Sequence, residues 1–399
     1  MKILGIETSC DETAAAVVED GVRILSNVVV SQIDIFAEYG GVIPEVAARS
    51  HLEAMMPVVN KALSDAGCTW GDIDAIAVTH APGLLGSLLI GTLTARTLAI
   101  LHDKPLYAVH HLKSHVCANW LSNAEETKPV FSSAGLEFSS TSYAGSRAEP
   151  PLRGEPVRPG RNIGVENSNQ NFMLQKRQVL VSQTPQFPLI ALVISGGHTQ
   201  ILYMPAHNQF EIIGTTRDDA VGECFDKVAK ILGLPYPGGP SIAKAALEGN
   251  AEKYKLPHPK IESLDFSFSG LKTAVLRAVQ KELGLPISHP SYDLKNHLSE
   301  KQVADFAASF QKTAVEILCE KLALALEQHP DAQSVVIAGG VSANKALREA
   351  LPEAYFPTPS LSGDNGAMVA AAAYYEITSG VEPVDPYSLN IYPRISIEK

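Results

Sequence analysis

The apolar positions of the first 110 residues form short runs at the start and a helical stripe after them. Three apolar runs separated by polar turns predict successive strands, at 2–7, 14–18 and 24–30. Apolar residues then recur on one helical face, which predicts a helix over about 44–66. A buried strand at 73–78, an apolar helix ending near Leu101 and a strand at 106–109 follow. Strands followed by alternating helix and strand predict an α/β layer with a mixed sheet.

The same order of elements returns in the second half of the chain. Apolar runs at 189–194 and 200–204 flank a small polar turn, as the first two strands of the chain do. A buried strand at 334–338 leads into a Gly-Gly turn and a helix from about Ala343. This weak internal repeat is the pattern expected of two related lobes that face each other across a cleft.

Paired strand–turn–strand units that grip phosphate are typical of the actin, Hsp70 and sugar-kinase fold. We therefore predict a two-lobed α/β protein with mixed sheets flanked by helices. Its N-terminal lobe would cover 1–110, completed by the C-terminal helix at about 370–399. Its C-terminal lobe would cover 111–369.

Residues 123–186 differ in character from the rest of the chain. They are rich in Ser, Gly, Pro, Asn and Gln and show no sustained hydrophobic period. Such a segment buries too little apolar surface to offset its ordering entropy, so we expect a disordered insertion or mobile loop. Basic residues outnumber acidic ones in its later part. A solvated linker is the simpler interpretation, and a flexible arm that contacts a polyanion is the alternative.

Composition and charge narrow the function classes. The chain has 399 residues, enough for two ordinary domains, and a formal net charge of −11. A protein that bound nucleic acid alone would usually have a basic face, so a nucleic-acid substrate would require a local basic patch or a basic partner. The five cysteines never form a CxxC motif, which suits a reducing compartment. The start MKILGIETSC is expected to be a strand rather than a leader, and no apolar run approaches ~18 residues, so we predict a cytoplasmic protein without a membrane span.

Two histidines one helical turn apart are the first candidate for chemistry. His111 and His115 follow a predicted strand directly, and at i and i+4 on a helix two imidazoles share one face and can bind one cation. A metallopeptidase would carry Glu after the first histidine, where this chain has Leu112. Asp364 lies in a turn before an Ala-rich helix. It is either a third metal ligand or a helix N-cap, and the cap is favoured when the residue is taken alone.

Three glycine- or acid-containing segments suit an anionic, hydroxyl-bearing ligand. The run 193–199 ends a strand in Ser-Gly-Gly, whose backbone N–H groups can form an anion site, although an ordinary tight hairpin is an equal alternative. Acidic residues at 219, 223 and 226 would share a helical face and bind hydroxyls, unless they form surface ion pairs. The turns at 238–240 and 338–344 would let a sugar or base lie against backbone.

Taken together, the motifs of this chain resemble the TsaD family of tRNA threonylcarbamoyltransferases. The matching segments occur in the family's order and cover nearly the whole chain except the insertion: 5–12, 39–47, 82–88, His111 with His115, 195–199, 218–227, 236–240, 266–273, 339–344 and 364–368. Two positions depart from the family pattern. Lys113 replaces an acidic residue between the histidines, and we expect it on another helical face; Ala81 replaces a glycine.

The resemblance implies transfer of threonylcarbamoyl from threonylcarbamoyl-adenylate to N6 of adenosine 37 in tRNAs that read ANN codons, with release of AMP. It implies one divalent metal per subunit, Fe²⁺ or alternatively Zn²⁺, on His111, His115 and Asp364. Asp11 and Glu12 would be catalytic, close to the phosphate. The residues that would bind the donor are Val193, Ile194, Ser195, Gly196, Gly197, Asp226, Gly239 and Asn344.

The resemblance also implies partners: the tRNA substrate, a TsaB-like paralogue, a TsaE-like ATPase and a separate synthase that makes the adenylate. Three other functions remain open at this stage. A small-molecule kinase or ATPase of the same fold would act without tRNA and would not need the paired histidines. A metallopeptidase lacks its Glu base here. An inactive scaffold would not need the His/His/Asp set.

Overall fold

The computed structural model of the protein describes residues 1–123, 133–135, 177–180 and 184–398. Contacts divide the chain into two units, one formed by Met1–Pro129 with Ser182–Lys399 and the other by Val130–Val181. In the second unit the short strands β7 (Ser133–Gly135) and β8 (Arg177–Leu180) pair antiparallel. The insertion predicted from composition lies mostly outside the described residues. Everything that follows concerns the first unit.

The first sheet has six strands in the order β5-β4-β1-β2-β3-β6. Its strands are β1 (Lys2–Glu7), β2 (Glu12–Glu19), β3 (Arg23–Ser31), β4 (Ala75–Ala81), β5 (Leu106–His110) and β6 (Ser122–Asn123). The first three form an antiparallel meander, and β4 and β5 join it parallel to β1. The mixed sheet predicted from the N-terminal pattern is confirmed.

The second sheet repeats the centre of the first. Its order is β11-β10-β9-β12, with the strands β9 (Leu189–Ile194), β10 (Thr199–Ala206), β11 (Gln209–Thr215) and β12 (Ser334–Ala338). The first three are an antiparallel meander, and β12 runs parallel to β9 as β4 does to β1. The internal repeat inferred from the sequence is therefore a repeat of topology, and the α/β fold with two mixed sheets is confirmed.

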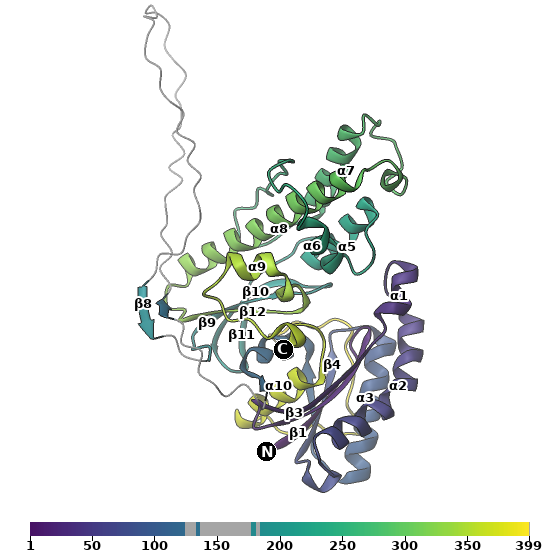
Figure 1. Cartoon of the computed structure of the whole chain (residues 1–399). Helices are drawn as coiled ribbons and strands as arrows, with labels where there is room; N and C mark the ends of the chain where they lie inside the picture. Colours follow the sequence, from purple (N-terminus) through teal and green to yellow (C-terminus); the bar gives the residue numbers. More distant parts are fainter. Residues whose placement is uncertain (124–132, 136–176, 181–183, 399) are drawn as a thin grey trace, which may run out of the picture. The chain divides into compact units, whose positions relative to one another are not determined.

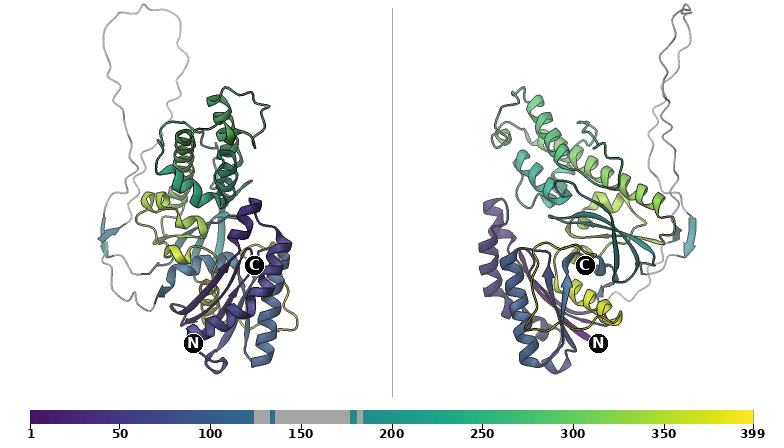
Figure 2. Two further views of the ribbon diagram at one scale, coloured as in Figure 1. Left: turned by 45° about the vertical axis from the view of Figure 1, so that its right-hand side comes forward. Right: turned by 180° about the vertical axis from the view of Figure 1, so that it is seen from behind.

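Helices cover both faces of the first sheet (Figures 1 and 2). On one face lie α2 (Pro44–Asp65) and α3 (Leu85–His102), packed on Leu4 and Ile6 of β1. On the other lies α10 (Gly366–Thr378), packed with Ile3. Alternate β1 residues face opposite layers, and both layers are apolar, so the strand is hydrophobic throughout.

The apolar cluster that contains α10 also contains residues of α4 (His111–Cys117), β9 and β12. Helix α4 contacts α10 on one side and strands of the second sheet on another. A seven-residue helix therefore lies where both sheets meet, and every residue of it except Lys113 is buried. This burial explains why the helix forms despite its length, since packing rather than propensity stabilises short helices.

The remaining helices are α1 (Ile33–Tyr39), α5 (Val221–Leu232), α6 (Gly238–Ala246), α7 (Ser269–Glu282), α8 (Glu300–Gln328) and α9 (Lys345–Ala350). The long helix α8 begins at a capping box, in which Ser299 Oγ accepts from the Gln302 N–H and the Gln302 side chain bonds back to the Ser299 N–H. Helix α8 packs against α6 and β9.

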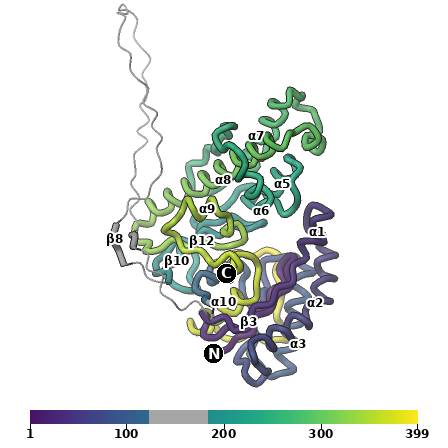
Figure 3. Tube along the Cα trace, viewed as in Figure 1, coloured from purple at the N-terminus to yellow at the C-terminus, as the bar shows by residue number. Residues whose placement is uncertain are grey.

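The C-terminal helix is shorter than predicted. We expected it at about 370–399, but α10 ends at Thr378. Gly380 follows with φ +86°, a left-handed conformation that ends the helix at no steric cost. The later residues return to the N-terminal elements (Figure 3), where the N–H of Val384 donates to Leu106 O and that of Tyr392 to His80 O.

One helix of the described part of the chain, α3, is long and apolar enough to cross a membrane by length and composition. The sequence prediction that no run approaches this length was wrong. Residues 85–102 have a mean hydropathy of 1.3, because the helix buries one face on β4 and α2 and also carries leucines on the opposite face. Its packing is that of a helix covering a sheet.

Candidate metal centre and adjoining pocket

The structure brings His111, His115 and Asp364 together. Asp364 Oδ1 lies 3.1 Å from His115 Nε2 and 3.6 Å from His111 Nε2. The histidines come from one face of α4, and their rings meet edge to face with centroids 4.6 Å apart. Asp364 comes from the turn before α10. It is not the helix cap, because the neighbouring Asn365 caps α10 by accepting the Met368 N–H at 3.0 Å.

The three side chains fit a divalent transition metal. One ligand atom of each lies within 4.8 Å of the others. His115 is 1% exposed; its Nδ1 makes no hydrogen bond within the described part of the chain, and Asp364 is the group that its Nε2 approaches, at 3.1 Å. A buried imidazole nitrogen without a partner is costly unless something else binds it. Two imidazoles and a carboxylate are a donor set that zinc and iron accept in proteins.

A buried carboxylate that the sequence analysis missed orients His111. Glu7, at the end of β1, is fully buried, and its Oε2 lies 3.2 Å from His111 Nδ1. Thr79 Oγ1 and the Ser9 N–H donate to the same carboxylate. Metal-binding histidines commonly donate their second ring nitrogen to such a group, which sets the tautomer. A carboxylate at the end of a mostly apolar strand was the signal available in the sequence.

The charges at this centre suit a cation. Burial alone would lower the pKa of His111, but the carboxylates of Asp364 and Glu7 raise it to about 9. Burial also tends to raise the pKa of Asp364, but the charge of His111 and the close approach and charge of His115 bring it well below its ordinary value. The carboxylates that favour a proton on His111 would equally favour a metal cation. Metal binding would then release the proton from the imidazole.

We expect Glu7→Gln to weaken metal binding by about 10- to 100-fold, the usual cost of losing an outer partner of a histidine ligand. The amide keeps the shape of the side chain but removes the charge that orients His111 Nδ1. Competition with a chromophoric chelator measures the change. Glu19→Gln is the matched control, because Glu19 lies on the neighbouring strand in an exposed ion pair with Arg23. Equal dissociation constants for both variants would contradict the role of Glu7.

Asp11 is the last residue of the turn between β1 and β2. Glu12 starts β2 and accepts a hydrogen bond from Ser31 Oγ at 3.1 Å. Burial, followed by the negative charges of Asp364 and Asp11, raises the pKa of Glu12 to about 10. Asp364, one of the three candidate metal ligands, thus contributes to the electrostatics of Glu12. At neutral pH the carboxyl group of Glu12 keeps its proton and does not repel a phosphate.

The Ser-Gly-Gly turn between β9 and β10 is open on one side. The Ser195 N–H donates to His198 O at 2.8 Å, which closes the hairpin. Gly196 and Gly197 are exposed, and a methyl group on either would have no atom within 4 Å. The start of α5 packs on this turn, because Gly222 approaches Ser195 O closely. Helix N-termini and exposed turn amides both attract anions.

The donor-binding candidates from β9 are placed differently. Val193 and Ile194 are fully buried, so only their backbone can face a ligand. His198, which the sequence analysis treated only as part of the turn, lies close enough to the metal centre for its electrostatics to matter. Burial and the charges of His111 and His115 lower the pKa of His198 to about 4. It is therefore a neutral imidazole at physiological pH.

The acidic motif of α5 divides into two roles. Asp219 precedes the helix, which begins at Val221, so the predicted shared helical face is wrong. Asp219 and Glu223 instead bind Lys227, at 2.7 and 2.8 Å, which is the ion-pair alternative. Asp226 faces the other way, and its Oδ1 accepts the Gly238 N–H at 2.7 Å.

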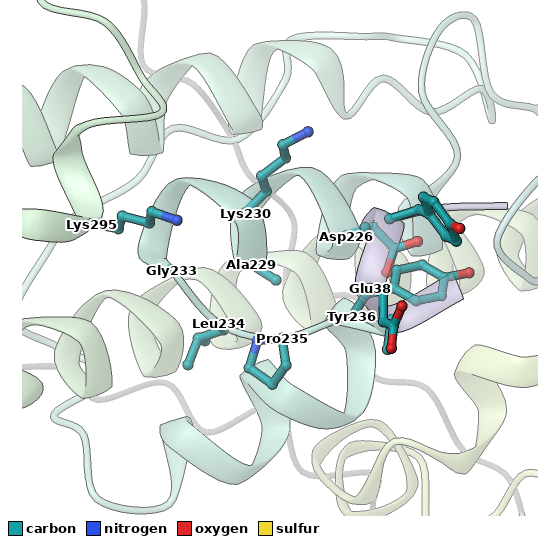
Figure 4. Close-up of a pocket in the computed structure, with 12 residues that line it drawn as sticks. Glu38, Asp226, Ala229, Lys230, Gly233, Leu234, Pro235, Tyr236 and Lys295 are labelled. Carbon is teal, nitrogen blue, oxygen red and sulfur yellow. The ribbon is translucent and has the colours of Figure 1, made fainter. Parts of the chain in front are cut away.

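Asp226 borders a cavity of about 260 Å³. Figure 4 shows its carboxylate close to Tyr236 and to Glu38 of α1, with Lys230 and Lys295 further along the wall. Burial and the charges of Asp11 and Asp226 raise the pKa of Tyr236.

Two other donor-binding candidates lie on helix starts. Gly239 is in the first turn of α6, and a methyl group there would have no atom within 4 Å, so its surface is open. Asn344 caps α9: its Oδ1 accepts the Leu347 N–H at 3.2 Å, and its Nδ2 donates to Gln311 Oε1 at 3.0 Å. Both ends of the Asn344 amide are engaged within the protein.

Lys113 does not enter the metal centre. Its ammonium lies 5.3 Å from the centroid of the Phe210 ring, on β11. The prediction that Lys113 occupies a different helical face from the histidines is confirmed, and the lysine adds no positive charge to the ligand set.

Known proteins match this chain over nearly its full length. The TsaD family model, described as tRNA N6-adenosine threonylcarbamoyltransferase, matches residues 23–135 and 170–371. Proteins of that name from Symbiobacterium thermophilum and Thermomicrobium roseum are each 42% identical, the first over 99% of this chain and 96% of its own length, the second over 96% and 93%. One from Clostridium perfringens is 41% identical over 99% and 98%. The residues between the two family matches, 136–169, lie inside the stretch set apart by composition. The chain belongs to the TsaD family.

Proposed function

We propose that this protein transfers the threonylcarbamoyl group of threonylcarbamoyl-adenylate to N6 of adenosine 37 in tRNAs that read ANN codons, and releases AMP. The observation that carries the proposal is the buried cluster of His111, His115 and Asp364 in a chain of the TsaD family. The exposed Ser-Gly-Gly turn and the pocket at Asp226 supply surfaces for an anion and for hydroxyl groups.

A divalent metal on His111, His115 and Asp364, Fe²⁺ or alternatively Zn²⁺, would supply a Lewis acid for the carbonyl or phosphate oxygens of the donor. Glu7 would keep His111 in the tautomer that leaves Nε2 free to bind. Elemental analysis of protein purified without added metal identifies the ion. A protein that contains neither metal, and whose activity neither restores, would contradict this assignment.

The threonylcarbamoyl-adenylate would lie against exposed main chain of the protein. The N–H groups of Gly196 and Gly197 would bind the phosphate of the adenylate, assisted by the start of α5. Asp226 would accept hydrogen bonds from hydroxyl groups of the sugar, and Gly239 would allow the nucleoside to lie flat on the start of α6. Asn344 would reach the donor by exchanging its bond to Gln311.

Transfer forms the bond between N6 and the carbamoyl carbon and breaks the bond from that carbon to the phosphate oxygen of AMP. It also frees one proton from N6. Asp11 is our candidate to receive it. Glu12 retains its own proton at neutral pH, so it would act instead as a hydrogen-bond donor to the phosphate of the leaving AMP. Because the adenine amine is a poor nucleophile, holding both reactants in line supplies much of the acceleration.

A tRNA modification assay tests the proposal. Purified chain, partner proteins, threonylcarbamoyl-adenylate and tRNA are expected to give modified tRNA and AMP in equal amounts, with no AMP release when tRNA is omitted. Hydrolysis of ATP or phosphorylation of a sugar by this chain alone, without tRNA, would favour the kinase or ATPase of the same fold. A cytoplasmic location remains our prediction.

We also propose that a TsaB-like paralogue binds the outer face of α2 and α3, with a TsaE-like ATPase and a separate adenylate synthase completing the system. Large apolar side chains are exposed there at spacings of one helical turn: Leu52, Met56, Leu85, Leu89 and Leu93. Each is at least 43% exposed, and the two helices pack side by side, so the side chains form one apolar surface. Such patches are typical of protein interfaces.

Leu89→Glu is expected to weaken binding of the paralogue by about 30-fold or more, the loss of one interface hot spot of about 2 kcal/mol. Modified tRNA falls in step, while metal content stays unchanged. Leu247→Glu is the control, because Leu247 is 75% exposed and lies far from this face in the sequence, just after α6. Titration by isothermal calorimetry measures both. Equal affinities would place the partner on another surface.

A further inference from the structure

The connection between α7 and α8 carries a second cluster of metal-binding side chains. His289, Asp293 and His297 follow one another at intervals of four residues. Asp293 Oδ2 lies 2.8 Å from His289 Nε2 and 3.0 Å from His297 Nε2. One ligand atom of each lies within 4.8 Å of the others. We propose that these three residues bind a divalent transition metal of the zinc class, separately from the centre at His111.

The segment that holds the cluster is anchored at both ends. Gln280, a 2% exposed residue of α7, donates from Nε2 to the carbonyls of Ile287 and His289, at 3.1 and 3.0 Å. Leu294, next to Asp293, is fully buried and lies in the part of the connection that packs against α5. The backbone that carries His289 and Asp293 is thus held by the protein core. An anchored frame reduces the ordering cost of binding an ion.

The three side chains are better suited to binding a metal ion than to forming hydrogen bonds with one another alone. Two imidazole nitrogens and one carboxylate oxygen are the ligands of three-residue zinc sites, with the remaining position left to water. The same set occurs in this chain at His111, His115 and Asp364. The other oxygen of Asp293 accepts from Asn296 Nδ2 at 2.9 Å, which holds the carboxylate toward the histidines. His297 is nearly half exposed, so an ion can enter from solvent.

Metal at this site would stabilise one wall of the pocket described above. Lys295 lies between Asp293 and His297 and lines the cavity together with Asp226 and Tyr236. Holding the connection in place holds Lys295 in place. The site would therefore support the pocket without touching its contents.

Zinc stoichiometry tests the inference. Metal-depleted full-length protein is titrated with Zn²⁺ in competition with a chromophoric chelator. The wild type is expected to bind two equivalents, His289→Ala/His297→Ala one, and His111→Ala/His115→Ala one. His258→Ala is the control and should bind two, because His258 lies beside Glu316 and Glu320 outside both clusters. A wild type that saturates at one equivalent, or a double variant at 289 and 297 that still binds two, overturns the proposal.

A milder variant guards against misfolding. His297→Gln keeps an amide that can donate to Asp293, so a hydrogen-bonded clasp would survive, whereas zinc binding at the second site should weaken at least about tenfold. Unchanged zinc affinity in this variant contradicts the proposal as well. The measurement needs neither tRNA nor donor. A failed transferase assay would leave the proposal of a second zinc site standing. A failed zinc titration would likewise leave the proposed transferase function standing.

Discussion

Replacing His115 by Ala is expected to lower tRNA modification by at least about 100-fold and to remove the metal from its centre. Loss of a partner behind a metal-binding histidine already costs about 10- to 100-fold, and a direct ligand contributes more. Replacing His115 tests metal binding more specifically than replacing His111, because His111 also contacts Glu7 and Ser9. Within the described part of the chain, the polar contact of the His115 ring is with Asp364, itself a candidate ligand, at 3.1 Å.

The measurements are modified adenosine formed per enzyme and metal per chain. Ser114→Ala is the matched control: Ser114 is equally buried in the same helix, and among the described residues its hydroxyl makes one long hydrogen bond, of 3.3 Å, to His110 O. Circular dichroism and the midpoint of thermal unfolding separate misfolding from loss of the ligand. A folded His115→Ala protein with wild-type turnover would overturn the role of the centre.

Strands buried on both faces were the elements that the sequence predicted best. The bounds 189–194 and 334–338 agree with β9 and β12 residue for residue. The first run is apolar throughout and the second is apolar after Ser334, and both are flanked by polar or turn residues, so their ends are sharp. Helix α2 was also predicted within one residue at its end, because Pro44 opens it and its inner face repeats at helical spacing.

Residues whose role depends on distant partners were harder to predict. Taken alone, Asp364 read as a cap, because the local pattern cannot distinguish it from Asn365; only the approach of α4 shows which of the two faces the histidines. From the sequence, Glu7 was predicted only to end a strand and received no role in the site. Its partners Thr79 and His111 are far away in the sequence. Tertiary contacts, rather than the local sequence pattern, assign the roles of these two carboxylates and one amide.

The acidic motif of α5 illustrates the same limit. Helical spacing alone placed Asp219 with Glu223 and Asp226, but the helix begins after Asp219. Asp218 shows why: it accepts from the backbone N–H groups of Phe268 and Ser269 and from two serine hydroxyls. These bonds hold the segment before α5 in an extended turn against the start of α7. Local propensity yields to such long-range bonds.

Gly5→Ala is expected to destabilise the protein by about 3 kcal/mol or more, at the upper end of the range for overpacked cores. A methyl group on Gly5 would come within 2.6 Å of Ala370 N and closer still to Gly366 O. Both are backbone atoms of α10, so no side-chain rotation can relieve the overlap. Helix α10 itself must move away from β1.

That movement would also reach the metal centre, because Asp364 lies two residues before the start of α10 and Glu7 two residues after Gly5. We therefore expect weaker metal binding together with a lower midpoint of unfolding in urea. Gly270→Ala is the control: its added methyl group meets open space on α7, and alanine in a helix is favoured by up to about 1 kcal/mol. If Gly5→Ala unfolds at the same urea concentration as the wild type, the close contact between β1 and α10 does not hold the two halves of the centre together.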